Sequence, residues 1–209
     1  MNIKVEDYDV IVFLTRLVYY DLEYPDCFNC THSLSLRSGL KLNKFDMDDY
    51  DLVVICGTNS FRDWVANFKV ALRLTPIQYK QAYEFINSIE KDSNKPIIIV
   101  GHSLGGGIAE YVASSFAIYF NVTCITFNGC GSKHLINPSL RDNVNTYNII
   151  TSRDILNGIT RRIPFAKNYL QHTGSSHIVK DDGLLPLSVK SHCNFSVFTK
   201  IDTDIFIDK

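Results

Sequence analysis

The sequence predicts an α/β domain with a mostly parallel central sheet and helices on both faces. Short β-branched runs alternate with segments of helical periodicity, and the connections between the runs are long enough for crossover helices. The chain has 209 residues, of which 45% are hydrophobic and 21% are charged. This composition suits one sizeable core, so we expect residues 1–209 to form a single domain.

The expected elements follow one another along the chain. Apolar residues at three- and four-residue spacing predict helices over residues 8–24, 76–91 and 107–120. Apolar runs rich in β-branched residues predict strands over residues 51–56, 97–100, 122–127 and 145–151. The turn residues Asp181, Asp182 and Gly183 lie between two apolar pairs and predict a late hairpin.

Charge and hydropathy limit the classes of partner. The net charge is −1, so the chain has no overall basic character for binding nucleic acid, and no basic patch for an anionic membrane is evident. The first ten residues are acidic where a signal peptide would be positively charged, and no window approaches the roughly 20 apolar residues that span a bilayer. We therefore expect a cytoplasmic protein without a nucleic-acid partner. Peripheral membrane contact and the oligomeric state stay open.

Six cysteines raise the question of a metal site. Cys27 and Cys30 form a C-x-x-C pair, but the other four cysteines are scattered and supply no second close pair. We expect free, mostly buried thiols, with no metal and no cofactor.

Residues 101–105 form a G-x-S-x-G motif centred on Ser103. A β-branched run precedes the motif and a helical pattern follows it, which is the context of a nucleophile elbow. A serine hydroxyl is a weak nucleophile, so it needs a base within reach and donors for the oxyanion. Gly101 and Gly105 leave room for the tight turn, and we expect the His102 side chain to point away from Ser103 and to pack.

A base and an acid are expected after the nucleophile, on loops beyond the carboxyl ends of strands. Asp154 follows the predicted strand 145–151 and is the candidate acid, and His192 is the candidate base. Chain order alone leaves other histidines and aspartates as alternatives for these roles: His172, His177, Asp181 and Asp182.

Two backbone N–H groups are needed to bind the oxyanion. Leu104 directly follows the nucleophile and supplies the first candidate. The second candidate is Thr58, in the segment that follows the predicted strand 51–56.

Two linked motifs resemble those of class-3 (fungal-type) lipases. Residues 57–67, GTNSFRDWVAN, resemble the family's G-T-x-S-x-x-D-W-x-x-N segment, and residues 101–106, GHSLGG, resemble its elbow. The resemblance implies an α/β-hydrolase fold and a family of triacylglycerol lipases, phospholipases A1 and feruloyl esterases. It implies these roles: Ser103 as nucleophile, His192 as base, Asp154 as acid, and Thr58 and Leu104 as oxyanion donors.

The chain departs from those lipases in one respect. Residues 67–75 are much shorter than the segment that usually carries the lid, so we expect little or no lid. This spacing is more similar to a short, little-characterised bacterial branch of lipase-like proteins.

These observations predict a serine hydrolase that cleaves carboxylic esters, namely lipid or phospholipid acyl esters, through an acyl-enzyme. Activity should decrease in acid because imidazolium cannot accept the serine proton. Two alternatives remain at this point. One is a catalytically inactive lipase fold that acts as a binding or regulatory protein, and the other is a thioesterase or acyltransferase that uses the same serine.

Overall fold

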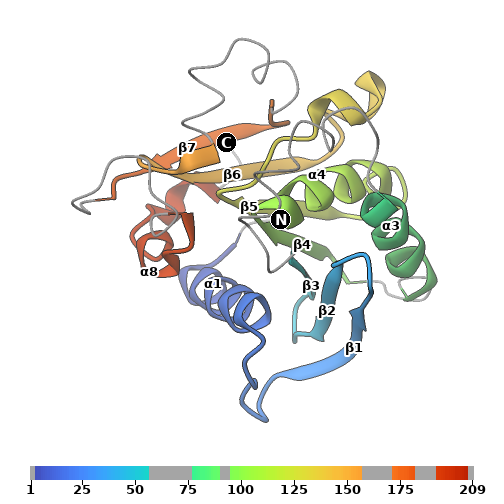
Figure 1. The fold of residues 1–209 in the computed structure, drawn as a ribbon, viewed down its shortest axis with the longest axis horizontal. Helices are drawn as coiled ribbons and strands as arrows, with labels where there is room; N and C mark the ends of the chain where they lie inside the picture. Colours follow the sequence, from blue (N-terminus) through green and yellow to red (C-terminus); the bar gives the residue numbers. More distant parts are fainter. Residues whose placement is uncertain (1–2, 57–76, 90–94, 157–170, 182–191, 207–209) are drawn as a thin grey trace.

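The computed structural model describes residues 3–56, 77–89, 95–156, 171–181 and 192–206. Its strands form a seven-stranded sheet (Figure 1): β1 (Asn29–Ser35), β2 (Lys41–Asp46), β3 (Asp51–Cys56), β4 (Ile97–His102), β5 (Val122–Phe127), β6 (Asn145–Thr151) and β7 (Ser175–Val179). The α-helices are α1 (Val5–Tyr20), α3 (Ile77–Ile89), α4 (Leu104–Phe116) and α8 (Phe195–Phe198). The described residues also include three short 3-10 helices: η1 (Lys133–Leu135), η2 (Pro138–Leu140) and η3 (Thr203–Phe206).

The strands lie in the sheet in the same order as in the sequence. β1 to β3 pair in antiparallel fashion, and β3 to β7 are parallel. In the parallel part, Cys56 lies opposite His102, and His102 lies opposite Phe127. The carboxyl ends of β3, β4 and β5 therefore meet at one edge, and the predicted mostly parallel sheet is confirmed.

Each face of the sheet carries its own hydrophobic core. Ile97 and Ile99 of β4 point to the face covered by α3 and α4, whereas Ile98 and Val100 point to the face covered by α1 and α8 (Figure 1). Side chains alternate along a strand, so a continuous apolar run such as that of β4 supplies both cores. The predicted placement of helices on both faces is confirmed.

The predicted bounds hold for the buried strands β3, β5 and β6, and β4 continues two residues further, to His102. The helix predicted over residues 8–24 ends at Tyr20 because Asp21 adopts a left-handed conformation with φ 58°. The helix predicted over residues 107–120 begins earlier, at Leu104, directly after the elbow serine. The late hairpin turn lies mostly outside the described residues.

The β1–β2 hairpin is absent from the sequence-based prediction. β1 is mostly exposed and polar, and its turn depends on Gly39, which has φ 84°. β2 is buried but contains Asn43 and Lys44, so it lacks the apolar run that reveals β3.

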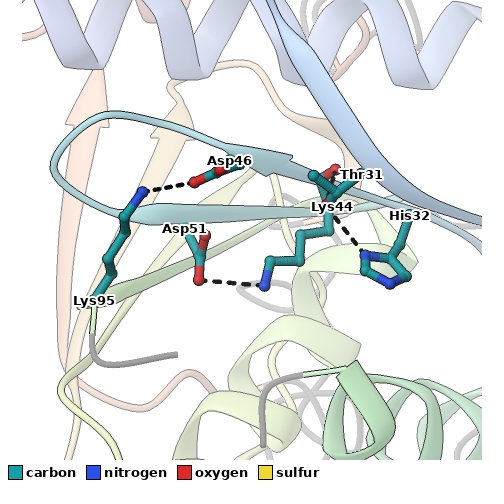
Figure 2. A pocket seen from close by; sticks show the side chains of 6 residues that line it. All are labelled: Thr31, His32, Lys44, Asp46, Asp51 and Lys95. Atoms are coloured by element: carbon teal, nitrogen blue, oxygen red, sulfur yellow. Dashed lines mark hydrogen bonds and ion pairs between the residues drawn. The ribbon is translucent and has the colours of Figure 1, made fainter. Parts of the chain in front are cut away.

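A polar pocket of about 280 Å³ lies beside the amino end of β3 (Figure 2). The G-x-S-x-G turn follows the carboxyl end of the parallel strand β4, so the pocket lies at the other end of these strands. Lys44 Nζ lies 3.2 Å from Asp51 Oδ2, and Lys95 Nζ lies 2.6 Å from Asp46 Oδ1. The first pair is buried and the second is partly exposed. Both lysines are thus paired with carboxylates, and the pocket has balanced charge.

We expect the Asp51→Asn substitution to lower the free energy of unfolding by about 3 kcal/mol, because it removes the carboxylate that neutralises buried Lys44. Asp46→Asn is the matched control, since it breaks an ion pair that water already screens, and it should change stability little. Urea unfolding followed by circular dichroism measures both. Equal losses for the two variants would contradict the interpretation.

Candidate active site

Ser103 lies between β4 and α4 in the conformation expected for an elbow. Its backbone has φ 59° and ψ −126°, which is a strained conformation for a residue with a side chain. The Ser103 N–H donates to the Phe127 carbonyl (3.2 Å), and the Ser103 carbonyl accepts from the N–H groups of Gly106 and Cys130 (3.0 Å each). These bonds fix the turn between the strand and the helix.

Glycines permit the close approach at this turn. A Cβ atom on Gly101 would lie 2.1 Å from the Gly105 carbonyl oxygen, and one on Gly106 would lie 2.6 Å from the Gly129 Cα atom. Both contacts are with backbone atoms that cannot move aside. Larger residues at these positions would separate β4 from α4, or α4 from the segment that follows β5.

His192 and Asp154 form a buried pair near the carboxyl edge of the sheet. His192 Nδ1 is hydrogen-bonded to Asp154 Oδ1, and both side chains are fully buried. Asp154 follows β6, where its N–H donates to the Thr151 carbonyl (3.0 Å). A carboxylate at Nδ1 holds the proton on that nitrogen, which makes Nε2 the basic nitrogen of the ring.

His102 joins the elbow to the segment that carries His192. His102 Nε2 lies 2.8 Å from the His192 carbonyl oxygen, and the centroids of the two imidazole rings are 4.8 Å apart. The His102 ring also packs against Tyr19 and Phe195, at centroid distances of 4.5 and 4.9 Å. His102 therefore packs as expected, and it also contacts the residue proposed as base.

The alternative histidines and acids have other partners. His172 Nδ1 contacts Glu110 Oε1 at 2.5 Å, and His177 Nε2 contacts the Ser175 hydroxyl at 2.8 Å. The Asp181 N–H donates to the Ser152 hydroxyl (3.1 Å). Three predicted features lie outside the described residues: Asp182, the 57–67 motif with Thr58, and the 67–75 segment. Leu104 is the first residue of α4.

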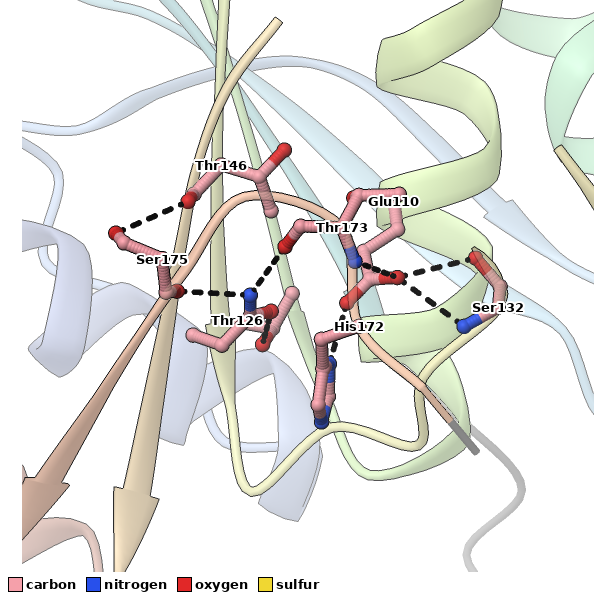
Figure 3. A network of polar contacts seen from close by, with 8 residues as sticks. Glu110, Thr126, Ser132, Thr146, His172, Thr173 and Ser175 are labelled. Carbon is pink, nitrogen blue, oxygen red and sulfur yellow. Dashed lines mark hydrogen bonds and ion pairs between the residues drawn. The ribbon is translucent and has the colours of Figure 1, made fainter. Parts of the chain in front are cut away.

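Glu110 is a buried carboxylate that sequence reasoning missed. Figure 3 shows it between Ser132, which follows β5, and the segment that precedes β7. Its Oε2 accepts from the Ser132 N–H (3.1 Å), the Ser132 hydroxyl (3.3 Å) and the Thr173 N–H (3.5 Å). The available signal is one acidic residue within an otherwise apolar, small-residue helix. Glu110 and His172 thus connect α4 to two segments beside the elbow.

The cysteines are all free: three are buried, Cys27 is exposed, and Cys30 and Cys193 are partly buried. Among the described residues, no group of three or more His, Cys, Asp or Glu side chains is placed to hold a metal ion. Within the same ranges, no helix has the length and hydropathy required to cross a bilayer.

Burial lowers the pKa of His102 well below its usual value, and nearby His192 adds to the shift. Tyr19 also faces the ring, but burial raises its pKa and keeps it neutral. A histidine held neutral in the fold destabilises the protein in acid, because the unfolded chain binds a proton that the folded chain does not.

We therefore expect His102 to reduce the free energy of unfolding by up to about 1.4 kcal/mol per pH unit below about pH 6.5. His102→Gln removes this titration, so its stability should depend less on pH between about pH 5.5 and about pH 7.5. Urea unfolding across this range measures the difference. Parallel curves for wild type and variant would contradict the assignment.

Comparison with known proteins relates the chain to a phospholipase-like family. A family model for a Tle-like phospholipase domain matches residues 33–148, which is more than half of the chain. Over 94 residues the chain is 32% identical to an extracellular phospholipase A1 from Serratia liquefaciens. This match includes 45% of the present chain and 28% of the Serratia protein. Because that relative is extracellular, the expected cytoplasmic location stays a prediction.

Solved lipase structures share the fold. Lipase II from Rhizopus niveus superposes with a TM-score of 0.62 at 14% identity, over 85% of this chain and 81% of that one. A mutant form of MDLA from Penicillium cyclopium gives 0.56 at 12% identity, over 91% and 86% of the two chains. The expected fold and the expected lipase-like family are thus confirmed. The chain belongs to the phospholipase-like family defined by the Tle-like phospholipase domain.

Proposed function

We propose that this chain hydrolyses acyl esters of phospholipids, with Ser103 as nucleophile, His192 as base and Asp154 as the acid that orients His192. Family membership supports ester hydrolysis. The observation that carries the site assignment is the buried His192–Asp154 pair. His102 connects this pair to the strained elbow at Ser103. A buried carboxylate–imidazole pair beside an elbow serine is the arrangement that acyl transfer requires.

The first half-reaction forms an acyl-enzyme. His192 Nε2 takes the proton from Ser103 Oγ as the oxygen attacks the ester carbonyl, and Asp154 stabilises the resulting imidazolium. Backbone N–H groups of Leu104 and Thr58 bind the developing oxyanion. The tetrahedral intermediate then collapses, and His192 donates its proton to the departing alcohol.

The second half-reaction regenerates the serine. His192 removes a proton from water, the water oxygen attacks the acyl carbonyl, and the carboxylic acid leaves as Ser103 Oγ recovers its proton. This cycle needs no group beyond those named, so the chemistry consumes only ester and water.

We expect a fluorophosphonate probe to add a single adduct to Ser103, detected by intact-mass analysis and peptide mapping. Ser103→Ala removes the attacking oxygen and should abolish the adduct, and His192→Ala should suppress it because the hydroxyl then lacks its base. Absence of an adduct on the wild type would overturn the proposal and favour the inactive binding-protein alternative.

The kinetics of ester hydrolysis separate the two candidate acids. Asp154→Asn should lower kcat by about 10⁴-fold, because the amide no longer holds His192 in its productive tautomer. Asp181→Asn is the matched control and should retain activity, since the Nδ1 atom of His192 is bonded to Asp154. The reverse result would assign the acid role to Asp181.

The phospholipid preference is inferred from the family and from the Serratia relative, which is a phospholipase A1. We expect the enzyme to release fatty acid from phosphatidylcholine vesicles faster than from a triacylglycerol emulsion. Vesicles labelled in either acyl chain identify the position that is cleaved, with Ser103→Ala as the blank. Faster cleavage of triacylglycerol or of an acyl thioester would contradict the preference.

A further inference from the structure

Asn128 occupies an unusual position directly after β5. It is fully buried, and it adopts φ 45°, a left-handed conformation that asparagine tolerates better than most residues. Its N–H donates to the Ile149 carbonyl of β6 (2.9 Å). The backbone therefore turns at the carboxyl edge of the sheet, where the elbow also lies.

The Asn128 side chain connects the segments that carry the acid and the base. Its Oδ1 accepts from the Thr151 N–H (2.8 Å) and from the Thr151 hydroxyl (3.2 Å). Thr151 in turn accepts the N–H of Asp154. On the other side, Asn128 Nδ2 donates to the His192 carbonyl (3.0 Å). One amide thus contacts the residue that anchors the acid and the backbone of the base.

The neighbours of Asn128 connect it to the nucleophile. The preceding residue, Phe127, accepts the N–H of Ser103, and Cys130 donates to the Ser103 carbonyl. Residues 127–130 therefore hold the elbow serine through both its N–H and its carbonyl group. The segments of Ser103, Asp154 and His192 all meet at this turn.

Few side chains fit these requirements. The site needs an acceptor toward Thr151 and a donor toward His192 on one short side chain, in a left-handed backbone conformation. Aspartate has nearly the same shape but only acceptors, so its second oxygen would face the His192 carbonyl. Glycine suits the backbone but makes neither side-chain contact.

We propose that Asn128 is a positioning residue that sets the His192–Asp154 pair in register with Ser103, an inference that rests on the function proposed above. Asn128 acts through the backbone of His192 and does not touch the substrate. Displacement of a catalytic group by about 1 Å can cost about 100-fold in rate. Loss of the Asn128 amide should therefore lower kcat more than it raises KM.

Asn148 offers a matched control. It is also buried, its Oδ1 accepts from the Thr126 hydroxyl (2.8 Å), and its Nδ2 donates to the Thr173 and Ser175 carbonyls (2.6 and 2.9 Å). Asn128→Asp and Asn148→Asp each remove one buried amide donor, so both should lower the melting temperature. Only the first change affects the His192 carbonyl.

The experiment compares wild type, Asn128→Asp, Asn128→Gly and Asn148→Asp well below their melting temperatures. The readouts are kcat and KM for a soluble ester and the rate at which the fluorophosphonate probe labels Ser103. We expect both Asn128 variants to lose about 10- to 100-fold in kcat and in labelling rate, with KM changed little. Asn148→Asp should keep both rates within about threefold of wild type. Asn128→Gly keeps the test decisive if the aspartate variant fails to fold, because glycine accepts the left-handed backbone.

Two failures are distinguishable. Folded Asn128 variants with the kcat and labelling rate of wild type, or no slower than Asn148→Asp, would overturn the positioning role and leave the serine hydrolase proposal intact. A wild-type protein that neither labels nor cleaves esters would overturn both.

Discussion

The site depends on a close approach of backbones at the carboxyl edge of the sheet. Ser103 has a positive φ, and the neighbouring glycines leave no space for a Cβ atom at Gly101 or Gly106. The second of these contacts presses the segment after β5 against α4, which brings the Cys130 N–H to the Ser103 carbonyl. The strain at the serine persists because the strands and helices on either side are held by two extensive cores.

Two buried carboxylate–histidine pairs connect the segments around this edge of the sheet. Asp154 pairs with His192, and Glu110 pairs with His172. A buried carboxylate is costly unless it is paired and hydrogen-bonded, and Glu110 meets that condition through Ser132 and Thr173 as well. The Glu110 pair joins α4 to the segments after β5 and before β7, whereas the Asp154 pair joins the two residues proposed above as acid and base.

Elements that have a local hydrophobic pattern could be predicted from the sequence. β3, β5 and β6 are buried on both faces and have continuous apolar runs, so their bounds could be predicted. β2 is buried from Leu42 to Phe45, but it places Asn43 and Lys44 inside because residues outside the strand pair with them, namely Tyr24 and Asp51. Ser103 lies in a motif, whereas Glu110 and Asn128 depend on partners 22 to 64 residues away. No motif marks Asn128, and the local signal for Glu110 is limited to one acidic residue within an otherwise apolar helix.

Chain order could not choose among the three late histidines, but their partners do distinguish them. His172 contacts Glu110, His177 contacts Ser175, and His192 contacts Asp154. The His192 carbonyl is also the acceptor for both His102, at the end of β4, and Asn128, just beyond β5. The same edge of the sheet therefore holds the elbow serine and the backbone of the proposed base. Both bonds act on the backbone of His192, so the position of the proposed base is tied to the strand that ends at the elbow and to the strand beside it.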